Sequence, residues 1–197
     1  MGREKYVKDI ERLFEKSPVV DFASIERAIK SKKAVKGYSK LFVSNLLKKG
    51  KIKRIAKGCY TKHENTSLSV FCFTPSYLGL QDALSMHNLW EQETIPIIIT
   101  ARKIRQGVRE IIETNVMIKR MDKKYFFGFN YYKEGEFYLP YSDIEKTFID
   151  MIYFRENLDK EVLDEIRKRM DKKKLGKYLK KYPKRFRERV RRVEKGE

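Results

Sequence analysis

Residues 40–61 read KLFVSNLLKKGKIKRIAKGCYT, and this stretch decides the fold of the N-terminal part of the chain. At about 100° per residue, an α-helix over 40–49 divides these side chains between two faces. One half of the wheel is apolar and carries Phe42, Val43, Leu46 and Leu47. The other half carries Lys40, Leu41, Ser44, Asn45, Lys48 and Lys49. Ser39 is the expected N-cap of this helix, and Gly50 its end.

The residues that follow this helix predict a basic β-hairpin. Residues 51–61 divide into two short strands around Lys57-Gly58, because a glycine at this place permits a tight turn. The hairpin carries four cations, which are Lys51, Lys53, Arg54 and Lys57.

Two helices are expected before this stretch. Apolar residues spaced i, i+1, i+4, i+7 and i+8 predict an amphipathic helix over residues 5–16, which Pro18 stops. Asp21 can cap a second helix whose inner face is Phe22, Ile25 and Ile29, and a polar stretch, 31–38, follows. Three short helices followed by a basic hairpin form the pattern of a winged helix-turn-helix.

Such a third helix is narrow enough to enter the major groove of DNA, where base edges differ in their donors and acceptors. Ser44 and Asn45 are the candidates for reading bases, whereas Lys40, Lys48 and Lys49 are candidates for phosphate contacts. The hairpin cations would lie beside the DNA backbone or the minor groove. The alternative is a three-helix unit used only for protein contacts.

The charge of the chain agrees with a polyanionic partner. The formal net charge is +19, and it is distributed unevenly. Residues 1–66 hold 18 basic and 7 acidic side chains, residues 67–159 hold 11 and 13, and residues 160–197 hold 17 and 7. Basic ends favour nucleic acid, because neutralised phosphates release counterions. A lysine-rich and glutamate-rich thermophilic composition would explain the total charge but not this distribution.

The middle of the chain is expected to mix strands and helices. Strands are predicted over 67–73, 96–100, 116–121, 125–132 and 136–139, the last three in an antiparallel sheet, and a helix over 74–88. Ser142-Asp143-Ile144-Glu145 predicts a capping box that opens a helix to about Arg155. The aromatic side chains between 125 and 138 favour the packed face of a sheet, with stacking on single-stranded bases as the alternative.

Residues 159–197 predict basic helices, the first capped by Asp159 and the second broken at Pro183. Their outer faces are a solvated surface, a second DNA contact, or a docking face for an acidic partner. The predicted fold is therefore α+β, with a winged helix-turn-helix (1–66), a mixed α/β domain with an antiparallel sheet (67–158) and a basic helical extension (159–197).

Catalysis and metal binding find little support in the sequence. Cys59, Cys72, His63 and His87 show no zinc-ligand spacing, and no phosphate-cradling glycine loop or nucleophile elbow occurs. A Mg²⁺-dependent nuclease needs converging acids, but Asp143 and Glu145 lie two residues apart and point to different faces of one helix. We therefore expect no catalytic residues, no metal and no cofactor. No apolar run reaches the length of a membrane span, and the expected location is the cytoplasm.

Three stretches resemble the AbiE-type (AbiEi) antitoxin family of transcriptional regulators. They are LFVSNLLKKGKIKRIAKGCYT (41–61), TPSYLGLQDALSMHNL (74–89) and YSDIEKTFIDMIYF (141–154). The resemblance implies a repressor of its own operon that binds inverted repeats in double-stranded DNA, as a homodimer or cooperatively. It also implies a functional partner, a nucleotidyltransferase-like toxin encoded nearby.

By the same resemblance, specific residues acquire expected roles. Ser44, Asn45, Lys48, Arg54 and Tyr60 match the DNA-reading helix and wing of the family. Thr147 and Asp150 match a later motif with a structural or neutralising role. The basic residues 160–197 depart from the family's pattern. The competing interpretation is a general RNA-binding or single-strand-binding protein, and a Mg²⁺-dependent nuclease is the third.

Overall fold

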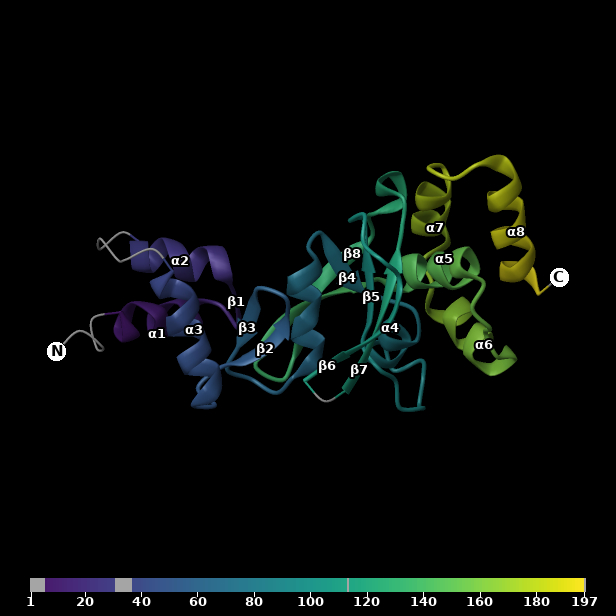
Figure 1. Cartoon of the computed structure of the whole chain (residues 1–197). Coiled ribbons are helices and arrows are strands. Elements are labelled where there is room, and N and C mark those ends of the chain that lie inside the picture. Colours follow the sequence, from purple (N-terminus) through teal and green to yellow (C-terminus); the bar gives the residue numbers. More distant parts are fainter. Residues whose placement is uncertain (1–5, 31–36, 113, 197) are drawn as a thin grey trace. The chain divides into compact units, whose positions relative to one another are not determined.

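The computed structural model describes residues 6–30, 37–112 and 114–196, which form an α+β structure (Figure 1). The chain divides into two compact units. The first comprises residues 1–72 and 110–114, and the second comprises residues 73–109 and 115–197. The basic C-terminal helices therefore belong to the same unit as the middle of the chain, whereas the sequence suggests a separate extension.

The N-terminal unit combines three helices with a small sheet in the part that is described. Its elements are α1 (Val7–Lys16), β1 (Val19–Asp21), α2 (Phe22–Lys30), α3 (Tyr38–Lys48), β2 (Lys53–Ala56) and β3 (Cys59–Thr61). The strands form an antiparallel sheet in the order β1-β3-β2. A short 3₁₀ helix, η1 (Thr66–Phe73), follows.

The apolar periodicity of this region is confirmed by its core. Ile10 and Phe14 are the buried residues of α1, and Ile25 and Ile29 of α2 have no exposed surface. The carboxylate of Asp21 accepts a hydrogen bond of 2.6 Å from the backbone N–H of Ser24, as expected for a cap. The predicted helices and hairpin are therefore present.

The start of α3 differs from the prediction. This helix begins at Tyr38, after Gly37 in a left-handed conformation (φ +87°), and Ser39 lies buried in its first turn. The prediction that Ser39 is the N-cap was wrong, because the chain enters the helix through a glycine that needs no side-chain cap. Most of the polar stretch predicted over 31–38 lies outside the described residues.

A mixed sheet organises the second half of the chain. Its strands are β4 (Ser76–Leu78), β5 (Ile97–Thr100), β6 (Gly107–Ile111), β7 (Thr114–Arg120), β8 (Phe129–Glu134) and β9 (Phe137–Ser142). Their order is β6-β7-β5-β4-β9-β8. β8 pairs with β9 in the antiparallel arrangement that the sequence predicts. β7 pairs in parallel with β5, so the prediction that residues 116–121 belong to the same antiparallel arrangement was wrong. β4 pairs with β9 in parallel.

Two other predictions were wrong near the boundary between the two units. Residues 67–73 form η1 rather than a strand, and Ser76–Leu78 form the inner strand β4 rather than the start of a helix. Helix α4 is confined to Gln81–Met86. Both segments are buried on nearly every side, and apolar runs of this kind do not reveal their secondary structure by periodicity.

Helices α5 (Ile144–Phe154), α6 (Lys160–Arg169), α7 (Lys172–Leu179) and α8 (Lys184–Lys195) gather on one side of the mixed sheet (Figure 1). Their inner residues share one core with the sheet, including Phe148, Ile166, Leu175 and Val190. The break at Pro183 is confirmed, since α8 begins at the next residue. Within the described ranges, none of the helices has the length and apolarity that crossing a membrane requires.

The packing of α3 generates a stability prediction. Phe42 is buried in the N-terminal core, whereas its neighbour Leu41 is 60% exposed. Phe42→Ala should lower the free energy of unfolding by about 3 kcal/mol because it leaves a cavity. Leu41→Ala should change this free energy by less than about 0.5 kcal/mol. Urea unfolding followed by circular dichroism measures both, and equal effects would contradict the placement of α3.

Candidate nucleic-acid interface

One side of α3 is fixed against the N-terminal core. Phe42 and Val43 are buried there, and Leu46 and Leu47 pack against the same cluster. Gly50 (φ +64°) ends the helix, and the N–H of Lys51 donates to the carbonyl of Leu46 at 3.0 Å. This closing turn leads directly into the hairpin, so the sequence that anchors α3 also positions β2 and β3.

The other side of α3 is open to solvent. Lys40, Asn45, Lys48 and Lys49 are exposed, and Ser44 is half-buried. The separation between the two faces is the one that the helical wheel predicted. A helix held in this way presents amide, hydroxyl and ammonium groups together on one surface.

The hairpin extends this polar surface. Ala56 pairs with Cys59, which leaves Lys57 and Gly58 as the two-residue turn, and Gly58 has the positive φ (+80°) that such a turn needs. Lys51, Arg54 and Lys57 are exposed. Together with α3, the hairpin therefore forms a surface that we call the α3–hairpin surface, made of Lys40, Ser44, Asn45, Lys48, Lys49, Lys51, Lys53, Arg54 and Lys57.

The nine residues that make up the α3–hairpin surface include seven cations and no carboxylate. No aspartate or glutamate occurs between Glu26 and Glu64 in the sequence. Lys53 has an acidic partner, since its Nζ lies 2.5 Å from the carboxylate of Glu64, and this pairing lowers the pKa of Glu64. Exposed ion pairs are weak, so Lys53 remains able to exchange this partner for another anion.

Tyr60 does not belong to this surface, and its predicted role in DNA contact was wrong. It lies on the central strand β3, opposite Val20 and Arg54, and its side chain is buried in the N-terminal core. A tyrosine beside basic residues can look like a ligand contact in a sequence. Its position on the inner face of β3 makes it a core residue instead.

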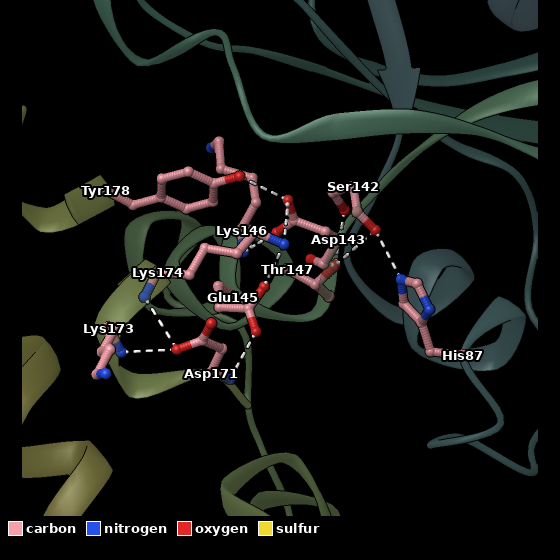
Figure 2. A network of polar contacts seen from close by, with 10 residues as sticks. All are labelled: His87, Ser142, Asp143, Glu145, Lys146, Thr147, Asp171, Lys173, Lys174 and Tyr178. Carbon is pink, nitrogen blue, oxygen red and sulfur yellow. Dashed lines mark hydrogen bonds and ion pairs between the residues drawn. The ribbon is translucent and has the colours of Figure 1, made fainter. Parts of the chain in front are cut away.

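Thr147 and Asp150 lie far from solvent in the second unit. The Thr147 hydroxyl is 2.7 Å from the Ser142 hydroxyl and donates to the carbonyl of Asp143 at 2.8 Å (Figure 2). The hydroxyl of Tyr77 donates to Asp150 at 2.7 Å, and Lys146 forms an ion pair with the same carboxylate. Neither Thr147 nor Asp150 has exposed surface, so the geometry supports a structural role.

Asp143 links this buried group to α7. Its carboxylate accepts the N–H of Lys146 at 2.8 Å, so Asp143, rather than Ser142, caps α5. The same carboxylate accepts the Tyr178 hydroxyl at 2.7 Å, and burial together with this hydrogen bond raises the pKa of Tyr178 (Figure 2).

A lysine of α7 makes a second connection to α5. The Nζ of Lys174 lies 3.1 Å from the carboxylate of Asp143 and 2.8 Å from that of Glu145. Sequence analysis missed Tyr77, Lys174 and Tyr178, because they are distant in the chain.

Burial perturbs the central ion pair. It lowers the pKa of Lys146 and raises the pKa of Asp150, since each charge is removed from water. Their mutual attraction opposes both shifts. Each charge is therefore stabilised in the core by the other, and removing one of them leaves its partner buried without a counter-charge.

The α5 ion pair yields a test by double-mutant cycle. Asp150→Leu alone should lower the free energy of unfolding by about 3–5 kcal/mol, because Lys146 would be left buried without a counter-charge. Replacing both residues, Lys146→Met with Asp150→Leu, should lower it by less than this single change. Urea denaturation of four proteins, which are the unmodified protein, the two single variants and the double variant, measures these differences. Additive losses would show that the two residues do not act as a pair.

The candidate residues thus fall into two groups. One is the cationic α3–hairpin surface. The other, which we call the buried group around α5, consists of Tyr77, Ser142, Asp143, Lys146, Thr147 and Asp150. Among the residues that the structure describes, no group of three or more His, Cys, Asp or Glu side chains could hold a metal ion. In comparisons with known proteins, no protein-family model matches this chain, and no curated protein matches it.

Proposed function

We propose that the N-terminal unit is a winged helix-turn-helix and that the protein is a sequence-specific, duplex-DNA-binding transcriptional regulator. The order of elements, α1-β1-α2-α3-β2-β3 with the sheet β1-β3-β2, agrees with this motif. In the proposed complex, α3 lies in the major groove and the β2–β3 hairpin is the wing.

The cationic α3–hairpin surface carries the proposal. Its exposed amide, Asn45, has the donor and acceptor that pair with the major-groove edge of adenine, and Ser44 offers a smaller contact beside it. Lys48 and Arg54 lie on α3 and β2, where they would meet phosphates on the two sides of the groove. Because no carboxylate occurs between Glu26 and Glu64, this stretch supplies no acid of its own to compete with phosphate.

Within this function, we propose an AbiE-type antitoxin that represses its own operon. The proposal rests on the resemblance of residues 41–61, 74–89 and 141–154, which correspond to α3 with the hairpin, to β4 with α4, and to α5. A nucleotidyltransferase-like toxin encoded next to this gene would be the functional partner. The identity of the neighbouring gene tests this part of the proposal directly.

The second unit carries a further cationic surface on α7 and α8. Residues 172–195 hold thirteen lysines and arginines but only two glutamates. Their apolar members, Leu175, Leu179 and Val190, are buried, so most of the cations point outward. This surface favours a second, sequence-independent contact with the DNA backbone over a role in reading bases.

Charge reversal tests the principal proposal. Lys48→Glu with Arg54→Glu should weaken binding to the DNA upstream of the protein's own coding sequence at least ~100-fold, because two phosphate contacts become repulsive. Binding is measured by DNase footprinting and by mobility shift, and protection of an inverted repeat is expected for the unmodified protein.

The matched control is Arg12→Glu with Lys16→Glu, which makes the same charge change on exposed positions of α1. It should bind within about threefold of the unmodified protein. Circular dichroism verifies that both variants fold. Full protection by the Lys48/Arg54 variant would remove the assignment of the α3–hairpin surface. Equal affinity for duplex DNA, single strands and RNA at matched salt would favour general nucleic-acid binding instead.

The α7–α8 surface has its own test, which is the salt dependence of DNA binding. Replacing Arg185, Arg191 and Arg192 with glutamine should reduce the slope of log K against log salt by up to about 0.9 for each lost phosphate contact. Affinity for specific and random duplexes should fall by the same factor. Glutamine at Lys103, Arg105 and Lys123, which are exposed cations of the same unit, is the control. An unchanged slope in the triple arginine variant would exclude the contact.

A further inference from the structure

Most aromatic side chains between residues 125 and 138 are packed against other rings. Tyr125 stacks on Tyr182 with centroids 4.3 Å apart, and Phe129 stacks on Tyr77 at 5.1 Å. Phe126, Phe127 and Tyr132 also contact other aromatic rings. The packed-sheet interpretation of this segment therefore accounts for these five rings.

Tyr131 and Tyr138 are different, because they are 62% and 61% exposed. Within the described part of the chain, neither side chain has a ring contact, a cation contact or a hydrogen bond. Exposing two large rings to water is unfavourable in an isolated molecule. Their exposure is thus a feature that the packing of the fold does not explain.

The strand register places both rings on one face of the β8–β9 hairpin. Tyr131 is opposite Pro140, and Lys133 is opposite Tyr138. Directly opposed residues of antiparallel strands point to the same side, and so do residues two apart on one strand. Tyr131, Lys133 and Tyr138 consequently share a surface, which we call the tyrosine face.

The spacing within the tyrosine face suits a flat ligand. Tyr131 and Tyr138 are diagonal neighbours, whose Cα atoms are about 7–8 Å apart in such a pair. This separation of the backbone positions is about twice the roughly 3.4 Å rise between stacked bases, which is the spacing that two rings need in order to hold one base between them. β8 is the last strand of its sheet, which leaves this face accessible from the edge.

We propose that the tyrosine face binds unpaired nucleotide bases. Tyr131 and Tyr138 supply stacking surfaces that accept any base, and Lys133 lies beside them to meet the phosphate of the same strand. The ligand differs from that of the α3–hairpin surface, because the bases of a duplex are already stacked on each other and present only their edges. A net charge of +19 favours a polyanion over an acid-poor protein surface as the partner.

The test uses fluorescein-labelled dT20, rU20 and a 20-base-pair duplex, with affinity measured by anisotropy at one salt concentration. Tyr131→Ala with Tyr138→Ala should weaken binding of the single strands at least ~10-fold, since both stacking surfaces are lost. Tyr131→Phe with Tyr138→Phe keeps the rings and should bind within about twofold of the unmodified protein. Comparison of dT20 with rU20 shows whether DNA or RNA is the better ligand.

Binding of the duplex distinguishes this proposal from the proposed function. The double alanine variant should bind the duplex normally, whereas the Lys48/Arg54 variant should lose the duplex and retain most of its affinity for dT20. Unchanged single-strand affinity in the double alanine variant would overturn the proposal. A variant that changes only the oligomeric state in sedimentation equilibrium would overturn it too, because the tyrosine face would then be a contact between copies of the chain.

Discussion

The burial of one side of α3 is the constraint on which the polar surface of the N-terminal unit depends. Phe42 and Val43 can enter the core only in one rotation of the helix, and this rotation turns Asn45, Lys48 and Lys49 toward solvent. A short turn over residues 49–52 then carries the chain into β2. The packing of one helix side therefore fixes both the helix and the hairpin. The composition of the exposed surface is a consequence of what the opposite surface buries.

The second unit is subject to a different constraint, because two charged side chains lie inside its core. Lys146 and Asp150 are both fully buried, and each would be costly without the other. Tyr77 adds a hydrogen bond to Asp150, and Asp143 caps the helix while it binds Tyr178. These contacts connect β4, α5 and α7. Replacing a buried ion pair by apolar residues of similar volume is often neutral or stabilising, whereas removing one partner leaves the other charge buried and unpaired.

Sequence analysis correctly predicted the elements in which polar and apolar residues recur with a regular period. It was wrong about elements that are buried on all sides, because their residues show no such period. Phe42, Val43, Leu46 and Leu47 identified the inner side of α3 correctly, because its outer side is polar. β4 gave no such signal, since both of its faces are covered and Tyr77 and Leu78 are equally buried. The contacts within the buried group around α5 could not be predicted from the sequence for another reason. Asp143 and Asp150 were visible as acids on one helix, but their partners Tyr77 and Tyr178 lie 73 and 35 residues away from the carboxylates they bind.

The distribution of carboxylates explains how the chain keeps its cationic surfaces available. Asp143, Glu145 and Asp150 are buried, and Glu156 is paired with Lys119 at 2.6 Å. Apart from the pairing with Lys174, these acids satisfy donors inside the second unit. Like charges that face solvent repel each other and destabilise the compact state. A polyanion that binds only the folded chain removes this repulsion, so binding and folding stability should be linked in such a protein.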